Sequence, residues 1–254
     1  MSLASRIIPC LDIENDRVMK GINFVALRDA GDPAALAARY NADGADELVV
    51  LDIAASRDRR PIFLETIRRV AEQLSIPLTA GGGIRTLADA AAVVSAGADK
   101  VTVNTAATER PGLIEELSAE FGTQAVVLAI DAKRNADHWE VMVCGGRTST
   151  GLDAIAWAKR GIALGAGEIL LTSLDRDGTQ RGYDIPLTAA ISKAVAVPVI
   201  ASGGAKLPEH FVEVFTEGAA DAALAASIFH DAVQSIQILK QFLAARGVQV
   251  RLPC

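Results

Sequence analysis

The chain has 254 residues, of which 50% are hydrophobic and 22% charged, and it contains 9 prolines. This composition is typical of a globular protein and excludes a disordered or fibrous one. The 25 basic and 31 acidic residues give a formal net charge of −6, and no run of lysine or arginine stands out. Nucleic acid is therefore not expected as a partner, because it binds to basic surfaces.

The cysteines and the amino-terminal segment indicate where the protein works. Cys10, Cys144 and Cys254 lie far apart and form no CxxC pair or Cys/His cluster, so we expect a reducing compartment and no metal site. The first apolar stretch is too short for a signal peptide, and no run of about 18 uncharged apolar residues occurs. The sequence predicts a cytoplasmic protein with no membrane partner.

Short apolar runs rich in Val, Ile and Leu alternate with stretches of helical period along the whole chain. This alternation is typical of parallel strands joined by helices and covered on both faces. Pro33 and Pro208 stand where helices should begin, and Asp32 is a natural cap for the first of them. In chain order, the predicted strands are residues 6–12, 47–52, 76–80, 99–103, 125–131, 168–173, 197–201 and 221–225.

Two segments interrupt the alternation, and each follows the carboxyl end of a predicted strand. Residues 13–31 are polar and are predicted to form a long loop, which is a candidate lid. Residues 132–150 contain a second extension, in which residues 138–144 are predicted to be a strand of a small hairpin.

The sequence contains an internal repeat. IPLTAGGGI at 76–84 recurs as VPVIASGGA at 197–205, and GADELVVLD at 44–52 recurs at the same separation as GAGEILLTS at 165–173. Half-barrels of four parallel strands would each leave two unpaired edges, so two copies close most simply into one barrel. We predict a single (β/α)8 TIM barrel with pseudo-twofold symmetry, with half-barrel repeats at approximately 1–122 and 123–254.

Asp12 and Asp131 are the candidate catalytic residues. They end the first and fifth predicted strands, which are opposite each other in an eight-stranded barrel, and active sites of such barrels lie at the carboxyl ends of the strands. A pair of carboxylates can perform general acid and base catalysis. An aspartate after a strand can instead cap the next helix, but the symmetry of the repeat favours the catalytic interpretation.

Two glycine pairs are candidate phosphate sites. Gly83 and Gly204 follow the third and seventh strands, where bare backbone can present N–H groups to an anion. Asn104, Thr105 and Ser227 follow the neighbouring strands and would add donors beside these loops. The glycines could serve only a tight turn, but two such loops flanking two aspartates predict an elongated substrate with a phosphate at each end.

Further charges lie at both ends of the predicted barrel. Lys20, in the loop after the first strand, could close over a substrate phosphate, although a solvated lysine is the commoner case. At the amino ends, Arg6 points inward by parity with Asp12, and parity is ambiguous for Glu47. A salt-bridged plug is one interpretation of these bottom charges. The set is Arg6, Glu47, Lys100 and Glu168.

RIIPCLD, RVMKG, LRDAGDP, ADELVVLDIAAS, AGGGI, ADKVTVNTAA, AIDAKR, SLDRDGT, GYD and IASGGA follow one another in the order of one family. Over essentially all its length the chain resembles the cyclase subunits of imidazole glycerol phosphate synthase, from histidine biosynthesis. The resemblance implies a carbon–nitrogen lyase that needs no cofactor. Such an enzyme uses ammonia to convert a ribulosyl-formimino aminoimidazole carboxamide bisphosphate nucleotide into imidazole glycerol phosphate and aminoimidazole carboxamide ribotide.

The same resemblance assigns roles to residues. It implies that Asp12 and Asp131 are the acid and base, and that a glutaminase subunit, HisH, docks on the barrel bottom to form a heterodimer. The four bottom charges become an ammonia gate, with Asp99 and Gln124 at or near the docking face. The implied phosphate contacts are Gly83, Asn104 and Thr105 at one site, and Asp177, Gly178, Gly204 and Ser227 at the other.

Two departures from the family pattern and two rival interpretations remain. Asp16 replaces a usual glycine, which is expected to remove access to positive φ and reshape the loop carrying Lys20. Lys206 replaces another glycine near a phosphate loop. The rivals are the sister isomerase of the pathway, which needs no ammonia, and a non-catalytic phosphoribosyl-binding scaffold, in which the two aspartates would only repel a dianionic ligand.

Overall fold

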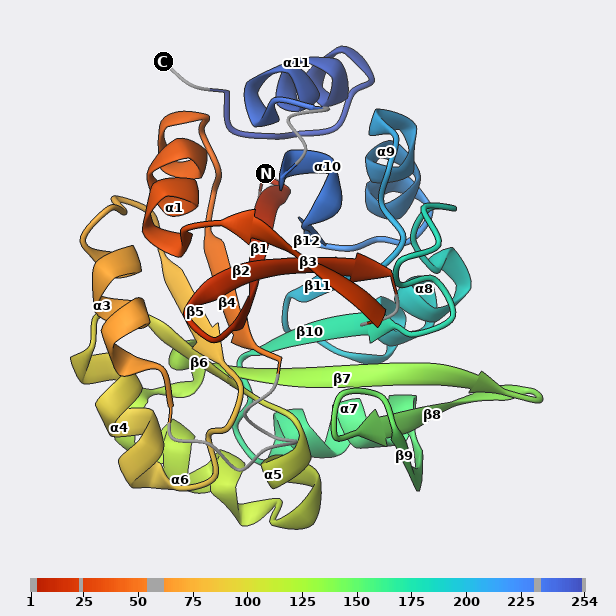
Figure 1. The fold of residues 1–254 in the computed structure, drawn as a ribbon. Helices are drawn as coiled ribbons and strands as arrows, with labels where there is room; N and C mark the ends of the chain where they lie inside the picture. The colour runs from red at the N-terminus through yellow and green to blue at the C-terminus, as the bar shows by residue number, and fades with distance from the viewer. Residues whose placement is uncertain (1–3, 23–24, 54–61, 231–233, 253–254) are drawn as a thin grey trace.

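Parallel strands close into a barrel, and helices surround them (Figure 1). The computed structural model describes residues 4–22, 25–53, 62–230 and 234–252, and the side chains of residues 20–28 lie outside that description. Among the described residues, the strands pair in the order β1, β4, β5, β6, β7, β10, β11 and β12, and β12 pairs with β1. This closed ring confirms the predicted (β/α)8 fold.

The elements agree with the alternation seen in the sequence. The barrel strands are β1 (Arg6–Glu14), β4 (Leu48–Asp52), β5 (Leu78–Gly81), β6 (Lys100–Val103), β7 (Val126–Asn135), β10 (Glu168–Ser173), β11 (Val199–Ser202) and β12 (Ala222–Ala225). The longer helices are α1 (Pro33–Ala42), α3 (Leu64–Ala71), α4 (Leu87–Ser95), α6 (Gly112–Phe121), α7 (Ala154–Ala163), α8 (Ile185–Ala194), α9 (Pro208–Thr216) and α11 (Ile236–Ala245). Short helices are α5 (Thr105–Glu109), η1 (Thr123–Ala125) and α10 (Ser227–His230).

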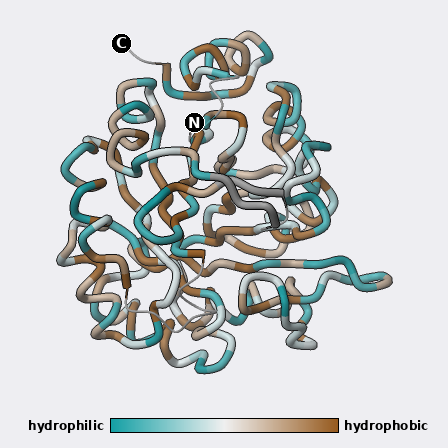
Figure 2. Tube along the Cα trace, viewed as in Figure 1, coloured by the Kyte–Doolittle hydropathy of each residue, from teal (hydrophilic) through white to brown (hydrophobic). Residues whose placement is uncertain are grey.

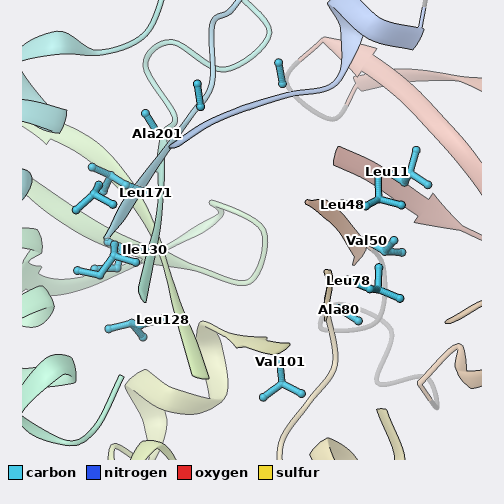
Figure 3. Close-up of a cluster of buried hydrophobic side chains, with 14 of the residues drawn as sticks. Leu11, Leu48, Val50, Leu78, Ala80, Val101, Leu128, Ile130, Leu171 and Ala201 are labelled. Atoms are coloured by element: carbon cyan, nitrogen blue, oxygen red, sulfur yellow. The ribbon is translucent and has the colours of Figure 1, made fainter. Parts of the chain in front are cut away.

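The strands separate two apolar layers because successive side chains point to opposite faces. A small inner cluster that includes Ile8, Cys10, Val49 and Leu170 fills the barrel. The outward-facing side chains form a much larger cluster with the helices, and Figure 3 shows its members on the strands disposed around the ring. In Figure 2, hydrophobic residues concentrate along the strands, whereas hydrophilic residues recur along the outer rim. This two-sided burial explains the nearly continuous apolar runs in the sequence.

Extra antiparallel strands extend from β1 and β7 at their carboxyl ends. The predicted hairpin after the fifth barrel strand is confirmed, since β8 (His138–Val143) pairs with β7 and with β9 (Thr148–Asp153). The predicted long loop over residues 13–31 is wrong. Its described residues form β2 (Arg17–Ile22) and β3 (Val25–Gly31), which pair with each other, and β2 also pairs with β1. Figure 1 shows this β2–β3 hairpin crossing the view of the barrel.

The effect expected of Asp16 is also wrong. Asn15 and Asp16 have φ of 52° and 57°, so the turn between β1 and β2 keeps a left-handed backbone without glycine. Asp and Asn tolerate this region better than most residues do. The Asp16 Oδ1 atom accepts a hydrogen bond of 2.6 Å from Thr66 Oγ1, which fixes this turn against α3.

The internal repeat appears as a recurring contact. Asp99 Oδ2 accepts a hydrogen bond of 2.8 Å from the backbone N–H of Leu78, and Asp221 Oδ2 accepts one of 2.9 Å from Val199. The first contact joins the start of β5 to the residue just before β6, and the second joins the start of β11 to the residue just before β12. The two contacts therefore occupy matching places in the two halves of the barrel. No helix in the described part of the chain is long and apolar enough to cross a membrane.

Candidate active site

A cavity of about 900 Å³ opens at the carboxyl ends of the barrel strands. It gathers nearly all of the residues that the sequence placed at this end. Those that line it are Asp12, Gly83, Asn104, Thr105, Asp131, Asp177, Gly178, Gly204 and Ser227. Residues from both halves of the chain therefore share one site.

Asp12 and Asp131 lie on strands β1 and β7, which are four steps apart around the barrel in either direction. Each carboxylate accepts a hydrogen bond from a different described side chain. Cys10 Sγ donates to Asp12 Oδ1 at 3.6 Å, and Asn104 Nδ2 donates to Asp131 Oδ2 at 2.9 Å. The different donors make the two carboxylates chemically distinct despite the symmetry of the barrel.

The pKa values of both carboxyl groups are raised from 3.8 to about 7. Burial is the largest cause, and the negative charge of Asp177 adds to it, whereas the hydrogen bonds from Cys10 and Asn104 lower the pKa values. Each group is therefore able to hold or release a proton near neutral pH, as general acid–base catalysis requires.

Asp177 is the third carboxylate of the cavity, in the loop between β10 and α8. Burial raises the pKa of Asp177, and the backbone N–H of Gly178 opposes that rise. The resemblance assigned Asp177 to a phosphate site, whereas its position relative to the strand ends did not single it out, because it lies several residues beyond the end of β10. Its influence on both other aspartates depends on the closed barrel.

The two glycine loops have left-handed backbones, with φ of +77° at Gly83 and +98° at Gly204. A Cβ atom on Gly204 would lie 2.2 Å from the carbonyl oxygen of Gly182, and one on Gly82 would lie 2.3 Å from that of Asp52. Glycine is thus needed for the turns themselves, and the same bare backbone is open to an anion in the cavity.

The helix starts beside these loops complete the polar wall of the cavity. Asn104 precedes α5, whose first residue is Thr105, and Ser227 begins α10. Thr105 Oγ1 accepts a hydrogen bond of 3.1 Å from the backbone N–H of Cys144, in the turn between β8 and β9. The hairpin therefore packs against one candidate phosphate site.

Lys20 lies on β2, where it pairs with Arg28 in the β2–β3 hairpin. Its side chain is outside the description, so its contact with a phosphate stays a prediction. Lys206, the second departure from the family pattern, is exposed just before α9, and its backbone N–H donates to His210 Nδ1 at 3.2 Å.

A ring of four charges closes the amino end of the barrel. Lys100 Nζ donates to Glu47 Oε2 at 2.9 Å and to Glu168 Oε2 at 2.8 Å. Arg6 also contacts both carboxylates, at 2.9 Å from Glu47 and directly with Glu168. Thr79 Oγ1 donates to Glu47 at 2.6 Å. The inward direction predicted for Arg6 is confirmed, and Glu47, whose parity was ambiguous, points inward as well.

Asp99 and Gln124 are exposed at the same end of the barrel. Asp99 caps the backbone of Leu78, and Gln124 Nε2 donates to the carbonyl oxygen of Phe121 at 3.2 Å. Both side chains are therefore partly committed to local structure while lying on an open face.

Sequence reasoning missed two kinds of cavity residue. Cys10 lies two residues before Asp12 on the same face of β1, so strand parity would have placed it beside the carboxylate. Arg85 and Arg147 also line the cavity, and both occur in loops that follow strands. Among the described residues, no group of three or more His, Cys, Asp or Glu side chains could hold a metal ion.

Comparison with known proteins gives matches that cover most of the chain or nearly all of it. The model of the family "Histidine biosynthesis protein" matches residues 6–235. "Imidazole glycerol phosphate synthase subunit HisF" of Acidobacterium capsulatum is 60% identical over 252 residues, which cover 99% of this chain and 100% of that protein. The protein of the same name from Solibacter usitatus is 61% identical over 251 residues, or 98% of this chain and 99% of that protein.

Polar groups converging at the carboxyl ends of eight parallel strands are the arrangement of a (β/α)8-barrel enzyme. The chain belongs to the histidine biosynthesis family and, within it, to the HisF subunits of imidazole glycerol phosphate synthase. It is therefore a cyclase of the lyase class, and the resemblance drawn from its motifs is confirmed.

Proposed function

We propose that the chain uses ammonia to convert the ribulosyl-formimino aminoimidazole carboxamide bisphosphate nucleotide into imidazole glycerol phosphate and aminoimidazole carboxamide ribotide. One observation carries the proposal. Asp12 and Asp131, on opposite strands of the barrel, have pKa values of about 7 and line one cavity between two glycine loops.

The two aspartates act as general acid and base. Ammonia condenses with the ribulosyl carbonyl and releases water, and its nitrogen then attacks the formimino carbon, which displaces the carboxamide ribotide and closes the ring. The incoming nitrogen loses its protons in these steps, and the leaving nitrogen of the ribotide takes up a proton. Near pH 7, one carboxyl group holds a proton while the other is free to accept one. A binding scaffold has no use for such a pair, because carboxylates repel a ligand that carries two phosphates.

The glycine loops hold the two ends of the substrate. One phosphate lies against Gly83, Asn104 and Thr105, where backbone N–H groups and a hydroxyl converge. The other lies against Asp177, Gly178, Gly204 and Ser227, which all line the cavity. Lys20, on the hairpin after β1, covers the bound substrate. A substrate with phosphates at both ends is thereby stretched across the barrel mouth, which places its centre between the two aspartates.

Ammonia enters from the opposite end. The charged ring of Arg6, Glu47, Lys100 and Glu168 closes that end, so it acts as the gate of an ammonia channel. The partner is the glutaminase subunit HisH, which forms a heterodimer on the face carrying Asp99 and Gln124. The names of the relatives support a partner, since each is called a subunit of a synthase.

The proposal also covers the domain organisation, the location of the protein and the choice between the cyclase and the sister isomerase. We infer one domain built of half-barrels at approximately 1–122 and 123–254, and a cytoplasmic location, in keeping with the free Cys10 and Cys144. Identity of about 60% to HisF subunits favours the cyclase over the sister isomerase.

The test is turnover by the purified chain without a partner. The chain is mixed with the bisphosphate nucleotide and an ammonium salt at mildly alkaline pH, and release of aminoimidazole carboxamide ribotide is followed. Release that depends on ammonium supports the proposal, whereas release without ammonium indicates another reaction. Binding without release, unchanged on adding the glutaminase subunit, would contradict it.

A further inference from the structure

Helix α10 is a single turn, Ser227–His230, and its first residue lines the cavity. One isolated turn of helix is unstable in water, because nucleation fixes several residues for one hydrogen bond. The barrel strand β12, which ends at Ala225, fixes the chain just before Ser227, and the contacts at the other end of the turn hold the helix itself in place. Figure 1 shows α10 between α1 and α9.

Two residues of α1 bind the carboxyl end of α10. Tyr40 Oη lies 2.5 Å from His230 Nδ1, and Tyr40 is only 1% exposed. Arg39 Nη2 donates to the Tyr40 hydroxyl at 2.9 Å and to the carbonyl oxygen of Phe229 at 2.8 Å. Because the hydroxyl accepts from Arg39, its own proton is available to His230 Nδ1. We call Arg39, Tyr40 and His230 the α10 latch.

Aromatic packing supports the same turn from its apolar side. Phe229 is 2% exposed and contacts the edge of Tyr40, with ring centroids 6.3 Å apart, and Phe211 of α9 at the same separation. Phe211 in turn packs on Tyr183, whose hydroxyl donates to the carbonyl oxygen of Leu224 at 3.1 Å. Tyr183 lies in the loop that carries Asp177 and Gly178, so these contacts reach both parts of the second phosphate site.

The other half of the barrel secures its corresponding helix differently. There the turn after β8 donates from Cys144 to Thr105, and Thr108 Oγ1 donates to the carbonyl oxygen of Thr105 at 2.8 Å within α5. At α10, the contacts come from α1 and reach the last two residues of the turn, Phe229 and His230.

We propose that Tyr40 and His230 are positioning residues for substrate binding, which hold α10 so that Ser227 meets the second phosphate. This inference rests on the proposed function for the identity of the ligand. Among the described residues that line the cavity, Ser227 is present and Tyr40 and His230 are not, so we expect the latch to act on affinity for the bisphosphate and not on the chemical step.

The test compares Tyr40→Phe with the parent chain. The substitution keeps the buried ring and removes only the hydroxyl. We expect KM and the dissociation constant for the bisphosphate nucleotide to rise roughly five- to tenfold, with kcat within about twofold. His230→Ala should behave in the same way. His230→Asn should restore most of the affinity, because its side-chain oxygen can accept from the Tyr40 hydroxyl.

Ser235→Ala is the matched control. It removes the cap of α11, where Ser235 Oγ donates to Asp43 at 2.8 Å, and so lowers stability outside the cavity. If the control raises KM as much as Tyr40→Phe does, or if Tyr40→Phe leaves the dissociation constant unchanged, the latch has no positioning role. Direct titration of the bisphosphate nucleotide separates the two proposals. If Tyr40→Phe weakens binding but the parent chain shows no turnover, the latch stands and only the proposed reaction is contradicted.

Discussion

Asp12 and Asp131 face one cavity from opposite strands of the barrel, and both have pKa values of about 7. If one must be protonated and the other ionised, kcat/KM is bell-shaped in pH with its maximum near 7. Asp177→Asn removes a charge that raises both pKa values, so the maximum should move to lower pH. A profile of kcat/KM against pH for both proteins checks this, and an unmoved maximum would show that Asp177 does not tune the pair.

The same pKa values predict how stability depends on pH. Between about pH 4 and 7, the folded chain keeps protons that the unfolded chain has released, so the free energy of unfolding falls as pH rises through that window. Asp131→Asn has no carboxyl group at this site, so its free energy of unfolding does not fall for this reason. The difference in free energy of unfolding, variant minus parent, should therefore be roughly 2 kcal/mol more positive at about pH 8.5 than at about pH 5.5.

Urea unfolding at these two pH values provides the measurement for both proteins. Asp12→Asn should show a similar change in the free energy of unfolding relative to the parent, because burial is the main cause of the raised pKa at both sites. A difference between parent and variant that is the same at both pH values would mean that the carboxyl group titrates normally in the folded chain.

The charged ring predicts a large effect of a single substitution. Lys100→Met leaves the buried carboxylates of Glu47 and Glu168 with fewer partners, and breaking such an ion pair should lower the free energy of unfolding by about 3 kcal/mol. Lys193→Met, at an exposed position on α8, is the control and should change it by less than about 0.5 kcal/mol. Equal midpoints in urea for the two variants would show that the ring contributes little to stability.

The glycine loops predict a contrast between two alanine substitutions. Gly204→Ala combines a positive φ with a close approach of Cβ to Gly182, and should lower the free energy of unfolding by roughly 3 kcal/mol. Gly112→Ala, at the start of α6 with no neighbour within 4 Å of its Cβ, should raise it by about 0.5 kcal/mol. Thermal unfolding measures both, and a neutral Gly204→Ala would indicate that this loop is loosely packed.

Much of the fold could be predicted because barrel strands are buried on both faces. The predicted strand over 168–173 agrees with β10, and that over 6–12 falls within β1 (Arg6–Glu14). The β2–β3 hairpin was missed because strands that pair outside the barrel need no continuous apolar run. The left-handed backbone of Asp16 was missed because the expectation considered only the loss of glycine.

The site was predicted only as far as repeat symmetry and motifs reach. Symmetry placed Asp12 opposite Asp131, because both end equivalent strands. Contacts across the closed barrel have no local signal. Arg6 and Glu168 are 162 residues apart, and only the predicted barrel placed them in one charged set; Tyr40 and His230 are 190 apart and belong to no repeated motif, so only the folded chain reveals that they touch.

The most direct test of the central claim compares turnover and binding in Asp12→Asn and Asp131→Asn. Each substitution keeps the shape of the side chain and removes its ability to exchange a proton near neutral pH. We predict that both variants lose turnover with ammonium while their dissociation constants for the bisphosphate nucleotide stay within a few-fold of the parent value. Loss of binding in parallel with turnover, or turnover that persists in either variant, would contradict acid–base catalysis by this pair.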